Sequence, residues 1–393
     1  MPKDIKYIDS VTLVDKRILF RVDYNVSLSE DRTIADDERI VQSLPSIKRL
    51  YPKNKLILVS HLDRPRKRDP KLSLVVVVKR LQKYLPGVKI SLVPDFLSKN
   101  KEIFEEQKNG EILVLENIRF YPGEENNDSE FAKHLASLAD VYVNDAFAVC
   151  HRAAASVVGV PKLLPSYGGL LLKKEVEMIK KVIKNPKKPL VAIIGGAKIS
   201  TKINLIGHLT EIADYVLLGG GLANVFFLAQ GHNIGKSICE YELVEKARQL
   251  LFAASARQTA IVLPTDVLVG DAENREKGGE IRKVSEISDG EAILDIGPET
   301  KAQFGSIIAR AKTIIWNGPV GYFENPLFKQ GTDFIYYSIA HNPEAISIVG
   351  GGDTIAAISN KEYLGKITHI STGGGAMLEF IENGTLPGIK ALE

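Results

Sequence analysis

The chain has 393 residues, of which 45% are hydrophobic and 25% are charged, and its formal net charge is +3. This composition is typical of a globular protein, and the net charge is too small to indicate nucleic-acid binding. Because single cores stop growing near about 250–300 residues, we expect two domains. The two cysteines, Cys150 and Cys239, have no metal-like spacing and indicate a reducing compartment. MPKDIKYIDS has no apolar signal region, so we expect a cytoplasmic protein.

Short β-rich segments alternate with helix-length segments along the chain. The strands that this pattern predicts are 17–25, 55–62, 111–120 and 141–147, then 190–196, 215–221, 260–266, 313–319, 346–352 and 368–374. Most are unbroken runs of Val, Ile and Leu, which are typical of parallel strands buried on both faces. We therefore expect an α/β protein with two doubly wound, Rossmann-like parallel sheets.

A long gap separates the fourth and fifth predicted strands. Within it, apolar residues recur at helical spacing and two prolines follow, which predicts a helix over 169–184. We interpret this helix as the connector between an N-terminal domain, 1–168, and a C-terminal domain, 185–376. The lysine-rich run 173–188 has the charge to bind nucleic acid, but it lacks aromatic residues and is better interpreted as a solvated helix face.

Two further segments could be misread. The stretch 215–235 has no Asp, Glu, Lys or Arg and is long enough to span a bilayer. It also contains three consecutive glycines and three polar residues, so strand, glycine turn and buried helix explain it better, and we expect no membrane contact. The segment 231–237 nearly forms a Walker A motif, but its glycine spacing is one residue short and it follows a predicted helix, so we interpret it as a turn.

Four apolar runs in the second half end in glycines. These are Gly195–Gly196, Gly219–Gly221, Gly350–Gly352 and Gly373–Gly375. Glycine lets the backbone approach a ligand, and the N-terminus of a following helix favours anions. A tight βα turn would explain any one of them, but four together favour a phosphate site, with a nucleotide as its ligand.

The residues at the predicted strand ends differ between the two halves of the chain. Ligands of open α/β sheets bind beyond the carboxyl ends of the strands. In the first half these ends carry Arg21, Asp23, Asn25, His61, Arg64, Arg119, Asn144, Asp145, His151 and Arg152. In the second they carry glycines with Lys198, Lys202, Asp266, Asn317 and Asp353. A cationic cup suits a small polyanion, and glycines with lysines and a carboxylate suit a magnesium–nucleotide, so the pattern predicts phosphoryl transfer.

Two lysines and an aspartate carry the nucleotide side of this hypothesis. Lys198 and Lys202 are four apart at a predicted helix start, so we expect them on one face, reaching phosphates together. Asp353 follows the triplet Gly350–Gly352, where it could face magnesium, cap a helix, or do both.

A dozen segments carry a family resemblance. In order they are RVDYNVSL, DDERI, SHLDRP, ENIRF, VNDAFAVCHRAAAS, GGAKISTKI, GGGLANVF, LPTDV, DIGPET, WNGPVGYFE, GGGDT and STGGGAMLE. From its first strand to its C-terminus the chain resembles the phosphoglycerate kinase family. The resemblance implies a monomeric kinase of glycolysis and gluconeogenesis that reversibly transfers the acyl phosphate of 1,3-bisphosphoglycerate to ADP, giving 3-phosphoglycerate and ATP, with Mg²⁺. It also implies a hinge and a C-terminal segment, 377–393, that returns to the N-terminal domain.

The resemblance also implies the site residues. The phosphoglycerate would be bound by Asp23, Asn25, Arg39, His61, Arg64, Arg119 and Arg152. The nucleotide would be bound by Gly196, Lys198, Lys202, Gly220, Asn317, Glu324, Gly351, Gly352, Asp353 and Thr354, with Asp353 on the metal side. Arg39, Lys198 and the backbone N–H groups of Gly373 and Gly374 would stabilise the transferred phosphoryl group. Since the attacking carboxylate is already ionised at neutral pH, no general base is expected.

The sequence departs from the family pattern at three positions. Ser27 replaces a usual proline, Asp63 a usual glycine, and Ala154 a usual histidine. Asp63 lies between His61 and Arg64, where it could oppose an anionic substrate or pair with Arg66 or Arg68. These departures leave open a non-catalytic descendant that only binds anions or partners. A nicotinamide-dependent dehydrogenase shares the architecture but would need a GxGxxG motif, which follows none of the predicted strands.

Overall fold

The chain folds into two compact units, each built around a parallel sheet. The computed structural model describes residues 4–97, 101–271 and 278–393. Residues up to Glu177 and the segment Thr385–Glu393 form unit 1, and Met178–Gly384 forms unit 2. The predicted class of two doubly wound parallel α/β sheets is confirmed.

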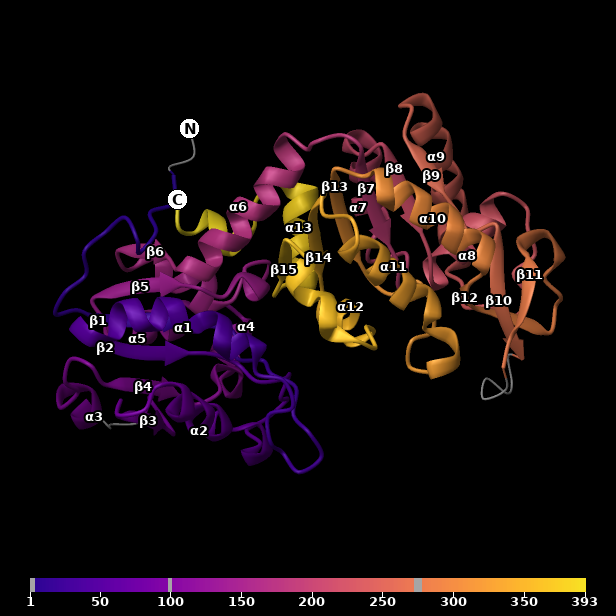
Figure 1. Cartoon of the computed structure of the whole chain (residues 1–393). Helices are drawn as coiled ribbons and strands as arrows, with labels where there is room; N and C mark the ends of the chain where they lie inside the picture. The colour runs from indigo at the N-terminus through magenta and orange to yellow at the C-terminus, as the bar shows by residue number, and fades with distance from the viewer. Residues whose placement is uncertain (1–3, 98–100, 272–277) are drawn as a thin grey trace. The chain divides into compact units, whose positions relative to one another are not determined.

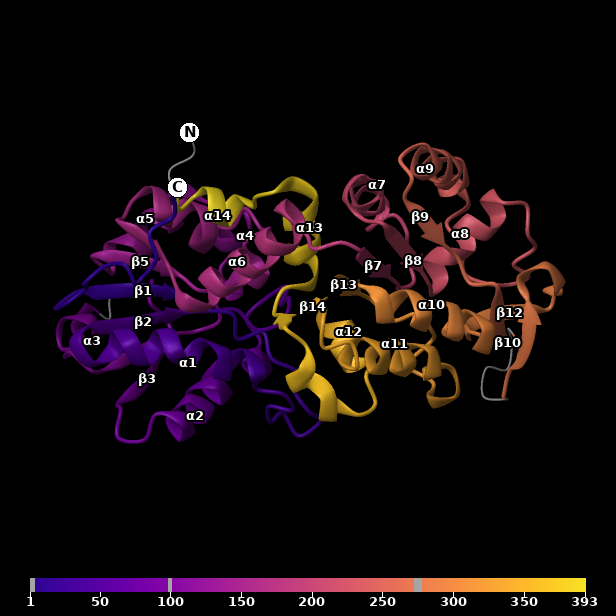
Figure 2. The ribbon, with the colours of Figure 1, turned by 45° about the horizontal axis from the view of Figure 1, so that its top comes forward.

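Unit 1 contains a six-stranded parallel sheet in the order β3-β4-β2-β1-β5-β6. Its strands are β1 (Arg17–Arg21), β2 (Lys55–Val59), β3 (Ile90–Val93), β4 (Ile112–Leu115), β5 (Val141–Asn144) and β6 (Ser166–Gly168). Its helices are α1 (Glu38–Leu50), α2 (Val75–Tyr84), α3 (Lys101–Glu105), α4 (Pro122–Glu125) and α5 (Ser129–Ser137). In Figure 2, β1 and β2 lie between α5 and α1.

The core of unit 1 follows from the alternation of side chains along each strand. Ile18 and Phe20 of β1 point to the face that also receives Ile40 and Ile47 of α1, and all four are fully buried. Leu19, between them, is also fully buried, so the strand is covered on both faces. This double burial explains why the strands read as unbroken apolar runs.

Unit 2 contains a second six-stranded parallel sheet, in the order β15-β14-β13-β7-β8-β9. Its strands are β7 (Leu190–Ile194), β8 (Tyr215–Leu218), β9 (Ala260–Val262), β13 (Thr313–Asn317), β14 (Ile346–Gly350) and β15 (His369–Ser371). Its helices are α7 (Ile203–Ile212), α8 (Gly221–Ala229), α9 (Val244–Ala256), α10 (Pro298–Arg310), α11 (Gln330–Ala340), α12 (Gly352–Ala356) and α13 (Gly374–Asn383). Figure 2 shows β7 and β8 between α7 and α9 on one side and α10 and α11 on the other.

Unit 2 also has a small antiparallel sheet that the sequence analysis missed. It has the order β11-β10-β12 and comprises β10 (Asp266–Asp271), β11 (Glu280–Lys283) and β12 (Glu291–Ile296). The strands β3 and β6 were missed as well. The ten predicted strands are all present; each ends two to five residues earlier than expected, and β4 and β15 also start one residue later. The predicted turn at 231–237 is confirmed as a loop after α8.

Helix α6 (Leu170–Lys184) carries the chain from unit 1 to unit 2, because the division between them falls at Glu177 and Met178. The last residues belong to unit 1. There α14 (Pro387–Lys390) packs close to Cys150, whose carbonyl accepts the N–H of Gly388 at 2.8 Å. Figure 1 follows this path by colour, from α6 in magenta to the yellow C-terminal segment.

Asp266 joins the antiparallel sheet to α10, and its removal should destabilise unit 2. The side chain is 2% exposed and accepts the backbone N–H groups of Glu299 at 3.0 Å and Thr300 at 2.7 Å. Asp266→Ala would leave these helix N-terminal donors without their acceptor, so the free energy of unfolding should fall by about 1–3 kcal/mol. Urea unfolding measures this change. Glu286→Ala, at an exposed carboxylate, is the control and should change stability by less than about 0.5 kcal/mol.

Candidate active site

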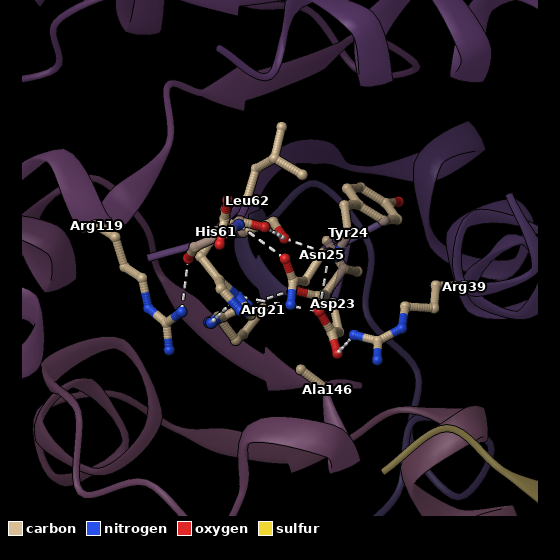
Figure 3. A network of polar contacts seen from close by, with 12 residues as sticks. Arg21, Asp23, Tyr24, Asn25, Arg39, His61, Leu62, Arg119 and Ala146 are labelled. Atoms are coloured by element: carbon tan, nitrogen blue, oxygen red, sulfur yellow. Dashed lines mark hydrogen bonds and ion pairs between the residues drawn. The ribbon is translucent and has the colours of Figure 1, made fainter. Parts of the chain in front are cut away.

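The loop after β1 carries a buried carboxylate around which polar side chains of unit 1 gather (Figure 3). Asp23 is 7% exposed and accepts a hydrogen bond of 2.5 Å from Arg39 of α1. It also accepts the backbone N–H of Asn25 at 3.0 Å and lies 3.9 Å from Nδ1 of His61. Burial alone would raise the pKa of Asp23, but Arg39 and the other neighbours hold it below the usual value. Asp23 is therefore ionised at neutral pH and fixes the Arg39 guanidinium.

His61 follows β2 and is buried beside Arg21, the last residue of β1. Burial holds the pKa of His61 well below its usual value, so the ring is neutral at pH 7. Nη2 of Arg21 lies 3.4 Å from Nδ1 of His61, and Nε of Arg21 donates to the hydroxyl of Ser156 at 2.9 Å. Asp23, His61 and Arg21 thus form one continuous polar network (Figure 3).

The loop after His61 is held by two of the predicted binding residues. The side-chain oxygen of Asn25 accepts the N–H of Asp63 at 2.7 Å, and Arg119 donates to the Asp63 carbonyl at 2.7 Å. Asp63 has a φ of 59°, the left-handed region where the family pattern has glycine. Its carboxylate is exposed and accepts the N–H of Arg64 at 2.8 Å. Within the described residues it forms no ion pair with a neighbouring arginine.

A cavity of about 330 Å³ brings the arginines of unit 1 together. Its charged lining residues are Arg21, Arg64, Arg119, Arg152, Glu124 and Glu125. Nε of Arg119 lies 3.4 Å from Glu125, and burial raises the pKa of Glu124. Three predicted substrate residues thus share this cavity, whereas Asp23, Arg39 and His61 connect to it through Arg21. Four guanidinium groups at one opening suit a ligand with phosphate or carboxylate oxygens.

Unit 2 has a cavity of about 400 Å³ at the ends of its strands. Of the predicted nucleotide residues, Gly196, Gly220, Glu324 and Asp353 line it. The sequence analysis missed its apolar wall, which includes Ile238, Ile293, Leu294, Val320 and Phe323. An apolar wall beside glycine loops and an exposed carboxylate is suited to a flat, partly apolar ring system attached to an anion. The wall could not be found from the sequence, because these residues come from several separate segments.

The glycine loops of unit 2 meet backbone to backbone. A Cβ on Gly220, whose φ is 67°, would lie 2.9 Å from the backbone N of Gly196. A Cβ on Gly374, the first residue of α13, would lie 2.6 Å from the Cα of Gly351. Gly373 is the N-cap of that helix, and Gly352 opens α12. Glycine is therefore required at these positions for the loops to converge.

The predicted helix start at Lys198 is wrong. Helix α7 begins at Ile203, so Lys198 lies exposed in the preceding turn and Lys202 is the N-cap. The turn is longer than expected because Gly196 takes a φ of 113° and directs the chain away from helical geometry. The Lys202 ammonium donates to the carbonyl of Gly195 at 2.6 Å. Burial lowers its pKa to about 8, although Asp353 acts in the opposite direction.

Asn317 and Thr354 hold the loops rather than line the cavity. Both donate to the carbonyl of Gly350, each at 2.7 Å. The hydroxyl of Thr354 also accepts the N–H of Gly318 at 2.8 Å. These bonds tie the end of β13 to the end of β14 and fix the backbone from which Asp353 projects.

A metal ion would depend on few protein ligands here. In residues 4–97, 101–271 and 278–393, no group of three or more His, Cys, Asp or Glu side chains could hold one. Asp353 is an exposed carboxylate of the cavity lining, and it acts electrostatically on Lys202. Mg²⁺ is commonly bound by one or two carboxylates together with substrate phosphates, so Asp353 fits that need.

No helix among the described residues is long and apolar enough to cross a membrane.

A two-unit α/β fold with an arginine-lined cavity in one unit and a glycine-loop cavity in the other defines a phosphotransferase of the kinase class. The phosphoglycerate kinase family model matches residues 8–384. The chain is 46% identical to the phosphoglycerate kinase of Dictyoglomus turgidum, over 97% of this chain and 96% of that one. It is 43% identical to the cytosolic phosphoglycerate kinase of Nicotiana tabacum, over 100% and 98%.

The comparison with solved structures indicates the same family. The structure of phosphoglycerate kinase from Coxiella burnetii is similar with a TM-score of 0.87 and 39% identity, covering 99% of each chain. The chain belongs to the phosphoglycerate kinase family. The predicted family, and with it the predicted kinase of glycolysis, are confirmed.

Asp63 offers a test of charge at the arginine cavity. An exposed carboxylate opposes a polyanion by roughly 1 kcal/mol at 4 Å in water. Both Asp63→Gly and Asp63→Asn should therefore lower the KM for 3-phosphoglycerate by up to about fivefold at low ionic strength, where screening is weak. Steady-state kinetics at two salt concentrations measure the effect. Asn keeps the short polar side chain, so equal effects of both variants assign the change to charge. An unchanged KM would mean that the Asp63 carboxylate does not affect substrate binding.

Lys202 should take up a proton when a nucleotide binds. Its pKa of about 8 in the free protein leaves it partly neutral at pH 8–9. A phosphate beside it favours the ammonium form and raises the pKa, so binding of ADP should draw protons from solution in that range. Calorimetry in two buffers with different ionisation enthalpies counts these protons. Lys202→Met should abolish the uptake and weaken ADP binding, while 3-phosphoglycerate binding stays unchanged; loss of both ligands would contradict the assignment.

Proposed function

We propose that unit 1 binds the phosphoglycerate and unit 2 binds the nucleotide in the reversible transfer of an acyl phosphate from 1,3-bisphosphoglycerate to ADP. One observation carries this assignment: the arginine-lined cavity of unit 1 and the glycine-loop cavity of unit 2 differ in chemistry, and each suits one substrate. Arg64, Arg119 and Arg152 bind phosphate oxygens as bidentate forks. Asp23 and Asn25 hold the neighbouring groups in place.

On the nucleotide side, the apolar wall of the cavity packs against the base, and Glu324 accepts the ribose hydroxyls. Lys198 and Lys202 bind the phosphates, together with the backbone N–H groups of the glycine loops. Asp353 would hold Mg²⁺ at this site. When bound, the ion would neutralise negative charge on the phosphates.

Catalysis consists of alignment and charge stabilisation, with no general base. In the reverse direction the attacking group is the carboxylate of 3-phosphoglycerate, which is ionised at neutral pH. Arg39 and Lys198 stabilise the phosphoryl group in transit, with the N–H groups of Gly373 and Gly374. Because each unit binds one substrate, closure about a hinge and exclusion of water belong to the proposed mechanism.

A coupled assay of ADP formation from Mg-ATP and 3-phosphoglycerate tests the function. Turnover that depends on both substrates is expected. A non-catalytic descendant would bind 3-phosphoglycerate without turnover, and that result would overturn the proposed mechanism while leaving the binding site in place.

Gel filtration with light scattering tests the expected monomer. A cytoplasmic location is proposed from the cytosolic relative, and since another plant relative is named chloroplastic, fractionation of the source cells is the test.

Arg39→Ala should lower kcat by roughly 10³-fold or more, by analogy with cationic groups that stabilise a transferred phosphoryl. The dissociation constant of 3-phosphoglycerate should change much less, because the contact is made chiefly in the transition state. Stopped-flow or steady-state kinetics measure kcat, and calorimetry measures binding. Lys48→Ala removes an exposed cation from the same helix and should leave both unchanged. An Arg39→Ala enzyme that keeps a tenth of the turnover would exclude this role.

A further inference from the structure

A chain of buried polar groups leads from α4 to the substrate network of unit 1, and it begins at a carboxylate that no step above uses. Glu124 is 2% exposed, and its two oxygens accept the hydroxyl of Ser156 at 2.6 Å and the N–H of Ser156 at 2.8 Å. Ser156 is fully buried. A buried carboxylate that receives two donors from one residue holds that residue in a single orientation.

Ser156 in turn fixes the orientation of Arg21. Since the hydroxyl proton of Ser156 is donated to Glu124, its oxygen is free to accept Nε–H of Arg21, which it does at 2.9 Å. A guanidinium has five N–H donors. Nη1 of Arg21 donates to the carbonyls of Val22 and Val59, so Ser156 and these two carbonyls fix the plane of the group. Arg21 is 2% exposed and still lines the arginine cavity.

The orientation of Arg21 determines the protonation pattern of His61. Nη2 of Arg21 lies 3.4 Å from Nδ1 of His61, and a guanidinium can only donate, so Nδ1 must be the acceptor. A neutral imidazole with an unprotonated Nδ1 carries its proton on Nε2. Within the described part of the chain, the recorded polar contacts of the His61 ring are all at Nδ1, so the Nε2–H is not committed to another protein group.

We propose that Glu124 and Ser156 are positioning residues of the phosphoglycerate site: they fix Arg21, which holds His61 in the tautomer that presents Nε2–H to the substrate. This inference rests on the proposed function of unit 1. Neither residue touches the substrate in it; both act through Arg21. The direction of every hydrogen bond in the series is then determined, from Arg21 to Ser156 to Glu124 on one side and from Arg21 to His61 on the other.

The test compares variants of the full chain. Ser156→Ala removes the acceptor for Arg21, and Glu124→Gln replaces one acceptor oxygen by a donor. Each should raise the dissociation constant of 3-phosphoglycerate about tenfold, the effect of one lost hydrogen bond to a charged group, and leave that of ADP unchanged. Ser156→Thr retains the hydroxyl and should stay closer to the unsubstituted protein. Nitrogen NMR of the labelled ring should show the Nε2–H tautomer in the unsubstituted protein and a mixture in Ser156→Ala.

The control is a buried serine away from the network. Ser347 of β14 is 2% exposed and accepts the N–H of Thr368 at 3.0 Å. Ser347→Ala should cost stability in urea as Ser156→Ala does, without any effect on 3-phosphoglycerate binding or on the His61 tautomer. Failure of an unsubstituted chain to bind 3-phosphoglycerate would refute the proposed function itself. If that chain binds and the Ser156 and Glu124 variants lose only stability, with the tautomer and the dissociation constant within twofold, the positioning role is wrong.

Discussion

The burial of both sheets on both faces is the constraint that determines where chemistry can occur in this protein. Ile18, Leu19 and Phe20 of β1 are all fully buried, and so is every residue of β7, Leu190–Ile194. Parallel strands of this kind have no solvent face for polar side chains. Charged groups can therefore be placed only where the strands end, and there the backbone also turns towards a helix N-terminus.

The two units use this edge in different ways. In unit 2 the loops converge through bare backbone: a Cβ on Gly195 would lie 2.1 Å from the carbonyl oxygen of Pro319. In the proposed function, anion affinity there comes from backbone N–H groups and from Lys202, whose ammonium donates to the carbonyl of Gly195. In unit 1 the edge is filled by side chains instead, and four arginines line one cavity. A compact polyanion needs many charges within reach, whereas a nucleotide needs room for its base beside its phosphates.

Much of this arrangement was predictable, because apolar runs and glycine triplets are local signals. All ten expected strands form, since each is a short β-rich run that its neighbours can bury. The missed strands give no such signal. β11 reads EIRK and has no buried residue, and β6 is three residues long. They exist because a neighbouring strand offers hydrogen bonds, which is a tertiary effect.

The site was predictable in its residue types and less so in its geometry. The family motifs placed Arg64, Arg119 and Arg152 in one cup, and they do line one cavity. The start of α7 was misplaced by five residues, because backbone direction after Gly196 depends on a φ that the sequence does not specify. The link from Glu124 to Ser156 joins residues 32 apart, and nothing local relates a carboxylate on one turn to a hydroxyl on another.

The arginines of unit 1 create an electrostatic conflict, which three carboxylates reduce: the buried Asp23 and Glu124 and the exposed Glu125. Four guanidinium groups around one cavity repel each other, and without a ligand they would tend to separate or to remain solvated. Glu124 and Glu125 lie in the same lining and compensate part of this charge, and Asp23 does the same for Arg39. Each of these carboxylates would also oppose the anionic substrate proposed for unit 1, so they would reduce its affinity while they keep the cations in place. A reaction that depends on alignment gains more from oriented cations than it loses in substrate affinity. A cation that is fixed before binding does not have to be reorganised when the phosphoryl group moves.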